Sequence, residues 1–468
     1  MRALVVSALA CATVAAPAWG QQPASPPPAV QRRYFTNMAD EDWGFLANRK
    51  YRNDFWDALK YIALPKEGWY LTLGGEARLS PQGFRARGDD QVPSTIDNYF
   101  LQRYLFAADL HMGPRFRVFT ELQSGIIKGR IGSPRPADQD LLEFHQAFVE
   151  YKSPKERRRQ VKIRVGRQEL NIGTGRLIAP SQGLNVMRSF DGLSAHLFSG
   201  AWSLDGGVAR LVRIKPGIFD DPPDHEQNFW GVSLTRQRLP WKTSQLNFYY
   251  LGLTRKKSTY VQGIGSEDRQ TVGSRLSGIW RRMDFNYDFI AQWGHFKGLP
   301  VLAYAISTDT GVKLKLGRFP ARLGFTLNSV SGDRDPHDQH LESFNPLFPG
   351  NSYSGMVGLL GPTNLSDFTP SLRVPLRRSL LVAFEMPSYF RTSVRDGVYS
   401  IDQRLILPGQ SNLYRHVGTN PGVIVSWQAQ RHINFTGVIT RFTSGKFLSD
   451  TPFKNGFGFY SIAGTYRF

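Results

Sequence analysis

The amino-acid sequence predicts an all-β fold: a transmembrane antiparallel up-and-down β-barrel of about 18 strands. Three observations support this prediction. Apolar and polar residues alternate along successive segments. The mean hydropathy is −0.33, and no apolar run is long enough for a membrane-spanning helix. Short and long connections alternate between the segments, as in barrels whose turns and loops lie on opposite sides of a membrane.

Residues 1–20 have the features of a secretory signal peptide. Arg2 supplies a positive charge, an apolar run follows, and the small residues Ala18 and Gly20 precede the expected cleavage site after Gly20. Cys11, the only cysteine, lies within this segment, so the mature chain has no disulfides or thiol chemistry. A lipoprotein signal would have Leu three residues before the cysteine, where this chain has Ala8.

Two further segments precede the predicted barrel of residues 68–468. Residues 21–33 form a Pro-rich linker whose composition predicts disorder. Residues 34–67 are predicted to form a short helical periplasmic or plug segment. Within it, residues 39–64 show a helical pattern that places Phe55, Leu59 and Ile62 on one face.

The alternation is clearest in WYLTLGGEARL from Trp69, MDFNYDFIAQWG from Met283 and ARLGFTLNS from Ala321. A soluble sandwich also alternates, but charges in mid-strand and aromatic residues at strand ends favour a barrel with a wet lumen. In QVKIRVGRQEL the alternation breaks at Arg167, which suggests a bulge.

The predicted connections fall into two classes. Short links are expected at 112–114, 200, 281–282, 377–378 and 429–430, and long external loops at 81–98, 125–139, 171–189, 255–270, 333–367, 391–415 and 444–456. An even number of strands returns both chain ends to the periplasmic side. The last strand, YSIAGTYRF, must pair with the first, and its aromatic terminus, Phe468, resembles the signal used by bacterial outer-membrane assembly machinery.

Charge predicts an anionic partner. The chain has 58 Lys and Arg against 38 Asp and Glu, a formal net charge of +20, and export makes nucleic acid an unsuitable partner. Strand parity places these bases in the lumen: Arg78, Arg103, Arg115, Arg117, Lys162, Arg164, Arg275, Lys313, Lys315, Arg322 and Arg373. The corresponding acids are Glu76, Asp109, Glu121, Glu150, Asp205, Asp284, Asp288 and Glu385. The surplus predicts an anion-selective channel, although individual arginines can simply neutralise these carboxylates.

The chain resembles the alginate-export family of bacterial outer-membrane porins over roughly residues 35–468. The resemblance rests on LGGEAR (Leu73–Arg78), VGRQELNIGTGRLIAP (Val165–Pro180), NVMRSFDGLSAHL (Asn185–Leu197), SGDRDPHDQH with FNPLFP (Ser331–Pro349) and the closing TSGKFL and YSIAGTYRF. It implies a monomeric barrel whose electropositive constriction passes an anionic uronic-acid polysaccharide by diffusion. The positions that match the family's motifs, and that the resemblance places along the pore, are Arg78, Arg103, Arg164, Arg167, Gln168, Arg176, Arg188 and Asp191. One departure is the turn Trp427–His432, which is too short for the periplasmic plug loop that the resemblance would otherwise imply.

Other functions remain open at this point. The loop residues Asp333, Asp335, His337, Asp338 and His340 offer oxygen and nitrogen ligands for a metal. Their spacing does not match an EF-hand, so the sequence predicts no metal site and no cofactor, and a Ca²⁺ site in this loop stays an open alternative. A barrel hydrolase of phospholipase or deacylase type would need Ser, His and an orienting residue on adjacent strands, and no such set is evident. A nonselective structural barrel or adhesin is the third alternative.

Overall fold

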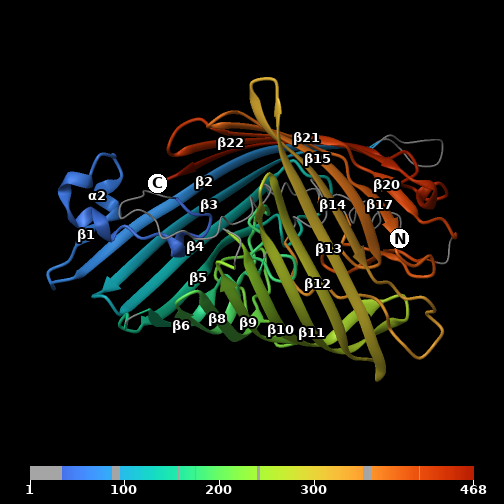
Figure 1. Cartoon of the computed structure of the whole chain (residues 1–468), viewed down its shortest axis with the longest axis horizontal. Coiled ribbons are helices and arrows are strands. Elements are labelled where there is room, and N and C mark those ends of the chain that lie inside the picture. The colour runs from blue at the N-terminus through green and yellow to red at the C-terminus, as the bar shows by residue number, and fades with distance from the viewer. Residues whose placement is uncertain are drawn as a thin grey trace.

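The computed structural model describes residues 34–86, 95–156, 158–173, 175–239, 243–350, 358, 360–409 and 412–468. The predicted signal peptide and linker lie outside these ranges. The chain forms a closed antiparallel barrel of eighteen strands, which confirms the predicted fold class (Figure 1). No helix in the described ranges has both the length and the apolar character needed to cross a membrane.

The strands follow one another around the barrel in chain order. They are β2 (Trp69–Ala86), β3 (Thr95–Met112), β4 (Phe116–Lys128), β5 (Asp140–Lys152), β6 (Arg159–Gln168), β7 (Phe190–Ser199), β8 (Trp202–Leu211), β9 (Gln227–Gln237), β10 (Gln245–Tyr260), β11 (Gly263–Trp280), β12 (Met283–Phe296), β13 (Leu299–Leu316), β14 (Phe319–Val330), β15 (Leu365–Arg377), β16 (Leu380–Glu385) continued by β17 (Ser388–Arg391), β20 (His416–Thr419) continued by β21 (Gly422–Gln428), β22 (Ile433–Ser444) and β23 (Phe457–Arg467). The two interrupted strands are neighbours, and each break contains a proline, Pro387 or Pro421, which cannot donate a ladder hydrogen bond. A small hairpin of β18 (Val398–Tyr399) and β19 (Leu405–Leu407) and the 3-10 turn η6 (Lys446–Leu448) lie in connecting segments.

The barrel closes through β2 and β23, as the terminal strand predicts. Their register runs from Glu76 opposite Arg467 to Ala86 opposite Phe457. The amide of Phe468 donates to the carbonyl of Gly75, and the Gly75 amide donates back, both at 3.0 Å. The backbone polar groups of the final residue are therefore paired, as a closed barrel in a membrane requires.

Strand parity determines which side chains face the lumen. Outward positions carry apolar residues such as Leu302 (70% exposed) and Ile439 (64% exposed). Inward positions carry buried polar and charged residues such as Glu76, Arg103 and Gln292. Because the side-chain period of a strand is two residues, a strand can present a mainly apolar outer face and a largely polar inner face at once.

The two ends of the barrel differ. We call the end with the short connections 113–115, 153–158, 200–201, 238–244, 281–282, 317–318, 378–379 and 429–432 the turn end, and the opposite end the loop end. The N-terminal segment and the C-terminus both lie at the turn end (Figure 1). At the loop end, the predicted loop 255–270 is wrong, because β10 and β11 continue through it and are joined by residues 261–262 alone. Three polar residues in that stretch, Ser258, Glu267 and Arg269, are buried, and Arg269 is bonded to Glu267 at 2.6 Å.

The N-terminal segment has little regular structure. It contains the 3-10 turns η1 (Met38–Asp40), η2 (Gly44–Ala47) and η3 (Arg49–Tyr51), the four-residue helix α2 (Asp57–Lys60) and the short strand β1 (Ile62–Ala63). The predicted helical face is wrong, since Phe55 is 85% exposed. Met38 and Ala39 are buried instead, packed against the inward-facing residues Leu105, Ala107, Phe119 and Phe148 of the barrel and Met187 of a connecting segment. Contacts with the barrel therefore override the helical pattern of the segment.

Candidate functional site

Two segments from the loop end meet inside the barrel. Ile178, in the segment that follows β6, forms a parallel bridge with Phe348, in the segment that follows β14. The Ala179 amide donates to the Phe348 carbonyl at 3.0 Å, and the Phe348 amide donates to the Leu177 carbonyl at 2.8 Å. Both segments pack on inward residues of the wall, including Leu251. They were predicted as external loops, but their buried contacts occupy part of the lumen.

Arginines of the wall anchor the first of these segments. Arg78 and Arg103 lie opposite each other on β2 and β3. Arg78 donates to the carbonyls of Gln182 and Gly183 at 3.3 and 2.8 Å, and Arg103 donates to those of Gln182 and Leu184 at 2.8 Å. These two predicted pore residues are therefore brought together, with their guanidinium groups engaged by loop carbonyls.

Glu76 holds Arg103 from the other side. Its carboxylate accepts from Arg103 at 2.5 Å and from Arg467 at 2.7 Å. Arg188 plays a similar anchoring part, since it donates to the carbonyls of Ala179, Phe348 and Pro349. A buried guanidinium can satisfy several carbonyls at once, so these residues fix the internal segments.

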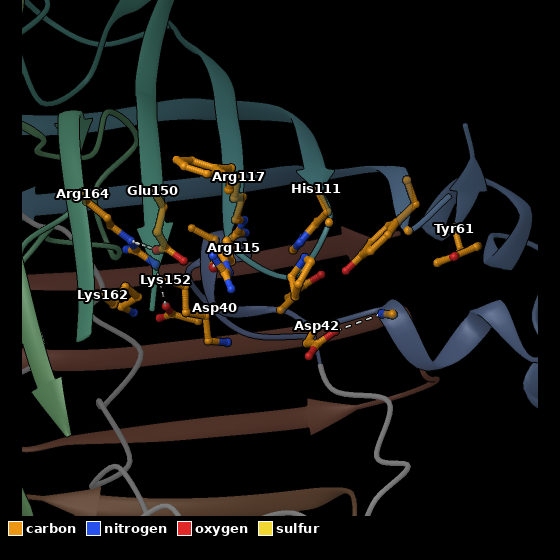
Figure 2. Close-up of a pocket in the computed structure, with 18 residues that line it drawn as sticks. Asp40, Asp42, Tyr61, His111, Arg115, Arg117, Glu150, Lys152, Lys162 and Arg164 are labelled. Carbon is orange, nitrogen blue, oxygen red and sulfur yellow. Dashed lines mark hydrogen bonds and ion pairs between the residues drawn. The ribbon is translucent and has the colours of Figure 1, made fainter. Parts of the chain in front are cut away.

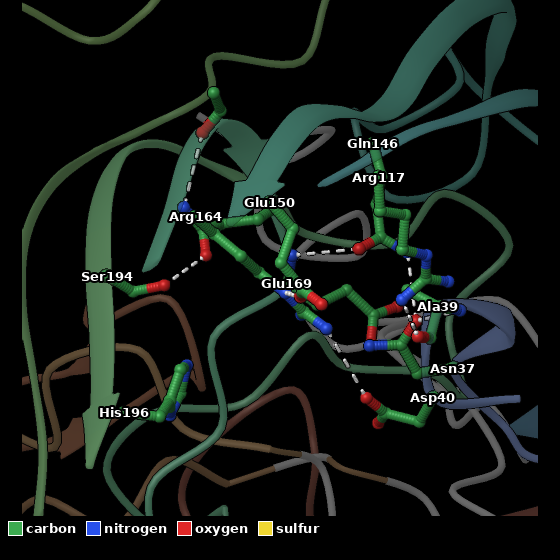
Figure 3. A network of polar contacts seen from close by, with 12 residues as sticks. Asn37, Ala39, Asp40, Arg117, Gln146, Glu150, Arg164, Glu169, Ser194 and His196 are labelled. Atoms are coloured by element: carbon green, nitrogen blue, oxygen red, sulfur yellow. Dashed lines mark hydrogen bonds and ion pairs between the residues drawn. The ribbon is translucent and has the colours of Figure 1, made fainter. Parts of the chain in front are cut away.

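Toward the turn end, the wall holds the N-terminal segment. Arg117 bonds both oxygens of Asp109, at 2.5 and 2.6 Å, and donates to the Ala39 carbonyl at 2.8 Å. Arg164 pairs with Glu150 and lies 3.8 Å from Asp40. Figure 3 shows both arginines reaching toward the η1 turn.

Beside these pairs lies a recess of about 620 Å³ at the turn end, which we call the basic recess. Its lining residues are Ala39, Asp40, Glu41, Asp42, Gly44, Tyr61, Gly68, Tyr70, His111, Gly113, Pro114, Arg115, Phe116, Arg117, Glu150, Lys152, Lys162 and Arg164. Figure 2 shows Arg115, Lys152 and Lys162 grouped near Asp40 at the strand ends. In the described part of the chain, these three bases make no ion pair, whereas Arg117 and Arg164 do.

The remaining predicted residues lie elsewhere. Arg176 is 3.8 Å from Asp288 on the β12 wall. Gln168 faces inward and accepts from the Ser194 hydroxyl at 2.6 Å. Arg167 and Asp191 pair at 2.9 Å, and both share the strand parity of outward residues such as Val165 and Leu193. The bulge predicted at Arg167 is absent from the β6–β7 register; the irregularities lie on the β4–β5 side.

Ion pairing divides the predicted lumen bases. Five of the eleven pair with acids: Arg103, Arg117, Arg164, Arg322 and Arg373. Among the described residues, six form no ion pair: Arg78, Arg115, Lys162, Arg275, Lys313 and Lys315. Strand parity in the sequence identified Arg115, Arg117, Lys162 and Arg164 of the recess lining, but it missed Lys152 and Asp40, which also line the recess.

A family model described as alginate export matches residues 69–456. The chain belongs to the alginate export family. Its barrel is similar to a BenF-like porin from Pseudomonas fluorescens Pf-5, with a TM-score of 0.57 and 10% identity over 85% of this chain and 98% of that one. It is also similar to OccAB3 of Acinetobacter baumannii, with a TM-score of 0.58 and 11% identity over 85% and 99% of the two chains.

A third similar structure is Pseudomonas aeruginosa OpdK with vanillate, with a TM-score of 0.55 and 10% identity over 85% of this chain and 98% of OpdK. No curated protein matches the chain in sequence. The family and the shared fold identify this alginate-export protein as a porin of the bacterial outer membrane. The resemblance read from the sequence motifs is therefore confirmed. In an outer-membrane barrel the short turns face the periplasm, which places the basic recess at the periplasmic mouth.

Proposed function

We propose that this porin is anion-selective and passes an anionic polysaccharide, such as an alginate-like polyuronate, or smaller anionic solutes by diffusion. The observation that carries the proposal is a group of three bases at the turn end, Arg115, Lys152 and Lys162 in the basic recess, which form no ion pair with any described acid. Lys313 and Lys315, at the same end of β13, add to them. Positive side chains in a confined pore raise the local concentration of anions and lower that of cations.

The chemistry of the recess suits carboxylates. Arg115 carries a planar guanidinium that can bind both oxygens of one carboxylate, while Lys152 and Lys162 act as point charges. A polyuronate has one carboxylate on every sugar, so successive units could contact successive bases. Vanillate, the solute in the OpdK structure, is also a carboxylate, and this supports the passage of such groups through a barrel of this fold.

The other predicted residues fit this function as supports for the channel. Arg78, Arg103 and Arg188 hold the internal segments, and Arg117 and Arg164 hold the N-terminal segment. We propose that selectivity is set mainly by the bases that these contacts leave unpaired. The porin is further proposed to act as a monomer and to be recognised by the barrel-assembly machinery through Phe468.

A hydrolase is the less supported alternative. His196 does pair with Asp205 at 2.7 Å, as a catalytic histidine would. However, the nearby Ser194 hydroxyl donates to Gln168, and His145 bonds to Glu169 at 3.0 Å. Among the described residues, neither histidine has a serine as a hydrogen-bond partner. We therefore propose that the protein has no hydrolytic function.

Single-channel recording tests the proposal against both alternatives. The purified porin is placed in a planar bilayer, and the reversal potential is measured in a KCl gradient and again with added oligouronate. The expected result is a reversal potential closer to the equilibrium potential of chloride than to that of potassium, together with a current that falls when oligouronate is added. A potential near zero would indicate a nonselective barrel, and a potassium-side potential would overturn the proposal. Release of fatty acid or acetate in a parallel assay would favour a hydrolase.

A further inference from the structure

The wall of the barrel has a gap at the loop end, between β5 and β7. β6 pairs with β5 only from Ala147 to Lys152, so the first half of β5 has no strand partner on that side. The segment that follows β8 fills the gap. The amides of Leu141 and Leu142 donate to the Gly217 carbonyl at 3.1 and 3.3 Å, and the Phe219 amide donates to the Leu142 carbonyl at 2.9 Å.

Three carboxylates converge where this segment meets β5. Ligand oxygens of Glu143, Asp220 and Asp221 all lie within 4.8 Å of one another. The Asp221 amide donates to Glu143 at 2.9 Å, which fixes the segment against the strand. Glu143 and Asp221 are buried, whereas Asp220 is exposed, so the cluster is open to solvent on one side. Like charges at this spacing repel one another strongly unless a cation lies between them.

Asp140 is an independent sign of a missing partner. It is 1% exposed, and neither of its carboxylate oxygens accepts a hydrogen bond from any residue that the structure describes. Its charge interacts with those of Asp221, Glu143 and Asp220, which places it at the same cluster. Buried charges in proteins are normally paired or bound to a metal, and an orphaned carboxylate beside three others lacks both.

The neighbouring guanidinium does not complete the cluster. Arg167 donates to Asp191 at 2.9 Å, to the Asp221 carbonyl at 2.9 Å and to the Phe144 carbonyl at 3.2 Å. Its contact with Glu143 is longer, at 3.4 Å. One positive charge thus faces five carboxylates, and most of its donors are directed elsewhere.

We propose that Glu143, Asp220 and Asp221, with Asp140 beside them, form a site for one Ca²⁺ ion. Every ligand is an oxygen, which Ca²⁺ prefers, and the set contains no histidine or cysteine to favour a transition metal. The open side gives water access to the remaining coordination positions. Ca²⁺ bound here fastens the segment after β8 to β5 and closes the wall.

Calcium binding to the detergent-solubilised porin tests the site. CaCl₂ is titrated calorimetrically into metal-free wild type, Asp220→Asn and Asp338→Asn. Asp220 is exposed, so its substitution leaves the fold intact, and Asp338 is an exposed aspartate in the segment after β14 that serves as the matched control. We expect one ion per chain with a Kd on the order of 10⁻⁴ M, as in extracellular Ca²⁺ modules, and binding at least about tenfold weaker in Asp220→Asn only. Absence of binding to wild type, or a loss confined to Asp338→Asn, would overturn the proposal.

A second variant tests the position of Asp220 without removing any carboxylate. A Cβ on Gly217 would lie 2.5 Å from Asp220 Oδ2, so Gly217→Ala displaces that carboxylate from the cluster. Gly458→Ala is the control, because a Cβ there meets open space. We expect weaker Ca²⁺ binding in Gly217→Ala and unchanged binding in Gly458→Ala. Wild-type affinity in Gly217→Ala would remove Asp220 from the ligand set.

Discussion

Reversing the unpaired charges of the basic recess should change the ion preference of the pore. The lining residues include five Lys and Arg against four Asp and Glu, a formal charge of +1. In the triple variant Arg115→Glu, Lys152→Glu, Lys162→Glu the same lining has two bases and seven acids, a charge of −5. The backbone pairing of β4, β5 and β6 does not depend on these side chains, and Lys152 and Arg115 are exposed.

The magnitude follows from Coulomb's law. A unit charge about 8 Å from a permeating ion in water contributes roughly 0.5 kcal/mol. A Debye length of about 10 Å at 0.1 M salt reduces that by about half. A change of six charges therefore shifts the free energy of an anion in the recess by about 1.4 kcal/mol, or tenfold in its concentration. The shift for potassium has the opposite sign, so the chloride-to-potassium permeability ratio falls by up to about a hundredfold.

The assay is the reversal potential in a tenfold KCl gradient, compared between wild type and variant. We expect its sign to change from the chloride side to the potassium side. The control is Arg281→Glu, Arg282→Glu, Arg378→Glu, which alters the same number of charges in turns at the same end but outside the recess lining. Equal potentials for wild type and the recess variant, or an equal shift in the control, would refute the role assigned to the recess.

Three further predictions concern the supports of the channel. Arg78→Gln removes charged donors to the carbonyls of Gln182 and Gly183, each worth about 1.5–3 kcal/mol, and should give larger and noisier single-channel currents. Arg275→Gln is the control and should not change the currents in this way, because Arg275 donates to the Asn286 side chain on the neighbouring strand. Burial would raise the pKa of Asp54, but the Trp56 amide, His432 and Arg431 outweigh it and lower the pKa to about 2. The stability that this carboxylate contributes is therefore complete above its unfolded pKa of about 3.9 and is lost as the pH falls toward 2. Proteolysis of the N-terminal segment should accordingly become faster on acidification. In Asp54→Asn, proteolysis of this segment should already be faster at neutral pH and should respond less to acid. Deletion of Phe468 removes two backbone hydrogen bonds to Gly75 and an aromatic ring whose centroid lies 4.4 Å from that of Trp56. This deletion should lower the amount of folded porin in outer-membrane fractions. The control Tyr460→Phe should leave that amount unchanged.

The strands were predictable because their signal is local. The period-two pattern gives both the existence of each strand and the face that each residue occupies, so Arg78, Arg103 and Arg117 could be assigned to the lumen before any contact was known. The prediction of an external loop at 255–270 was wrong because the charged residues of this stretch give it the composition of a loop. Arg269 and Glu267 in fact satisfy each other inside the barrel, and pairing of that kind cannot be read from one segment.

The internal segments and the N-terminal turns were not predictable for a related reason. Their positions depend on partners far away in the chain, such as Phe348 for Ile178 and Arg117 for Ala39. A single sequence shows no pattern that links these pairs. The helical pattern over 39–64 gave way because burying Met38 and Ala39 in the barrel mouth, with Arg117 and Arg164 as polar partners, stabilises an irregular path more than a short isolated helix would.

Pairing also changes how the net charge of +20 should be interpreted. A guanidinium bonded to a buried carboxylate contributes little to the field felt by an ion in the pore, because the two charges largely cancel at a distance. Two such ion pairs are Arg103 with Glu76 and Arg117 with Asp109, and their role is structural. Sequence parity nevertheless counts the two arginines together with the other lumen bases. Under the proposed function, selectivity depends on the recess bases Arg115, Lys152 and Lys162. Neutralising the paired arginines should therefore disturb loop positions before it disturbs ion preference.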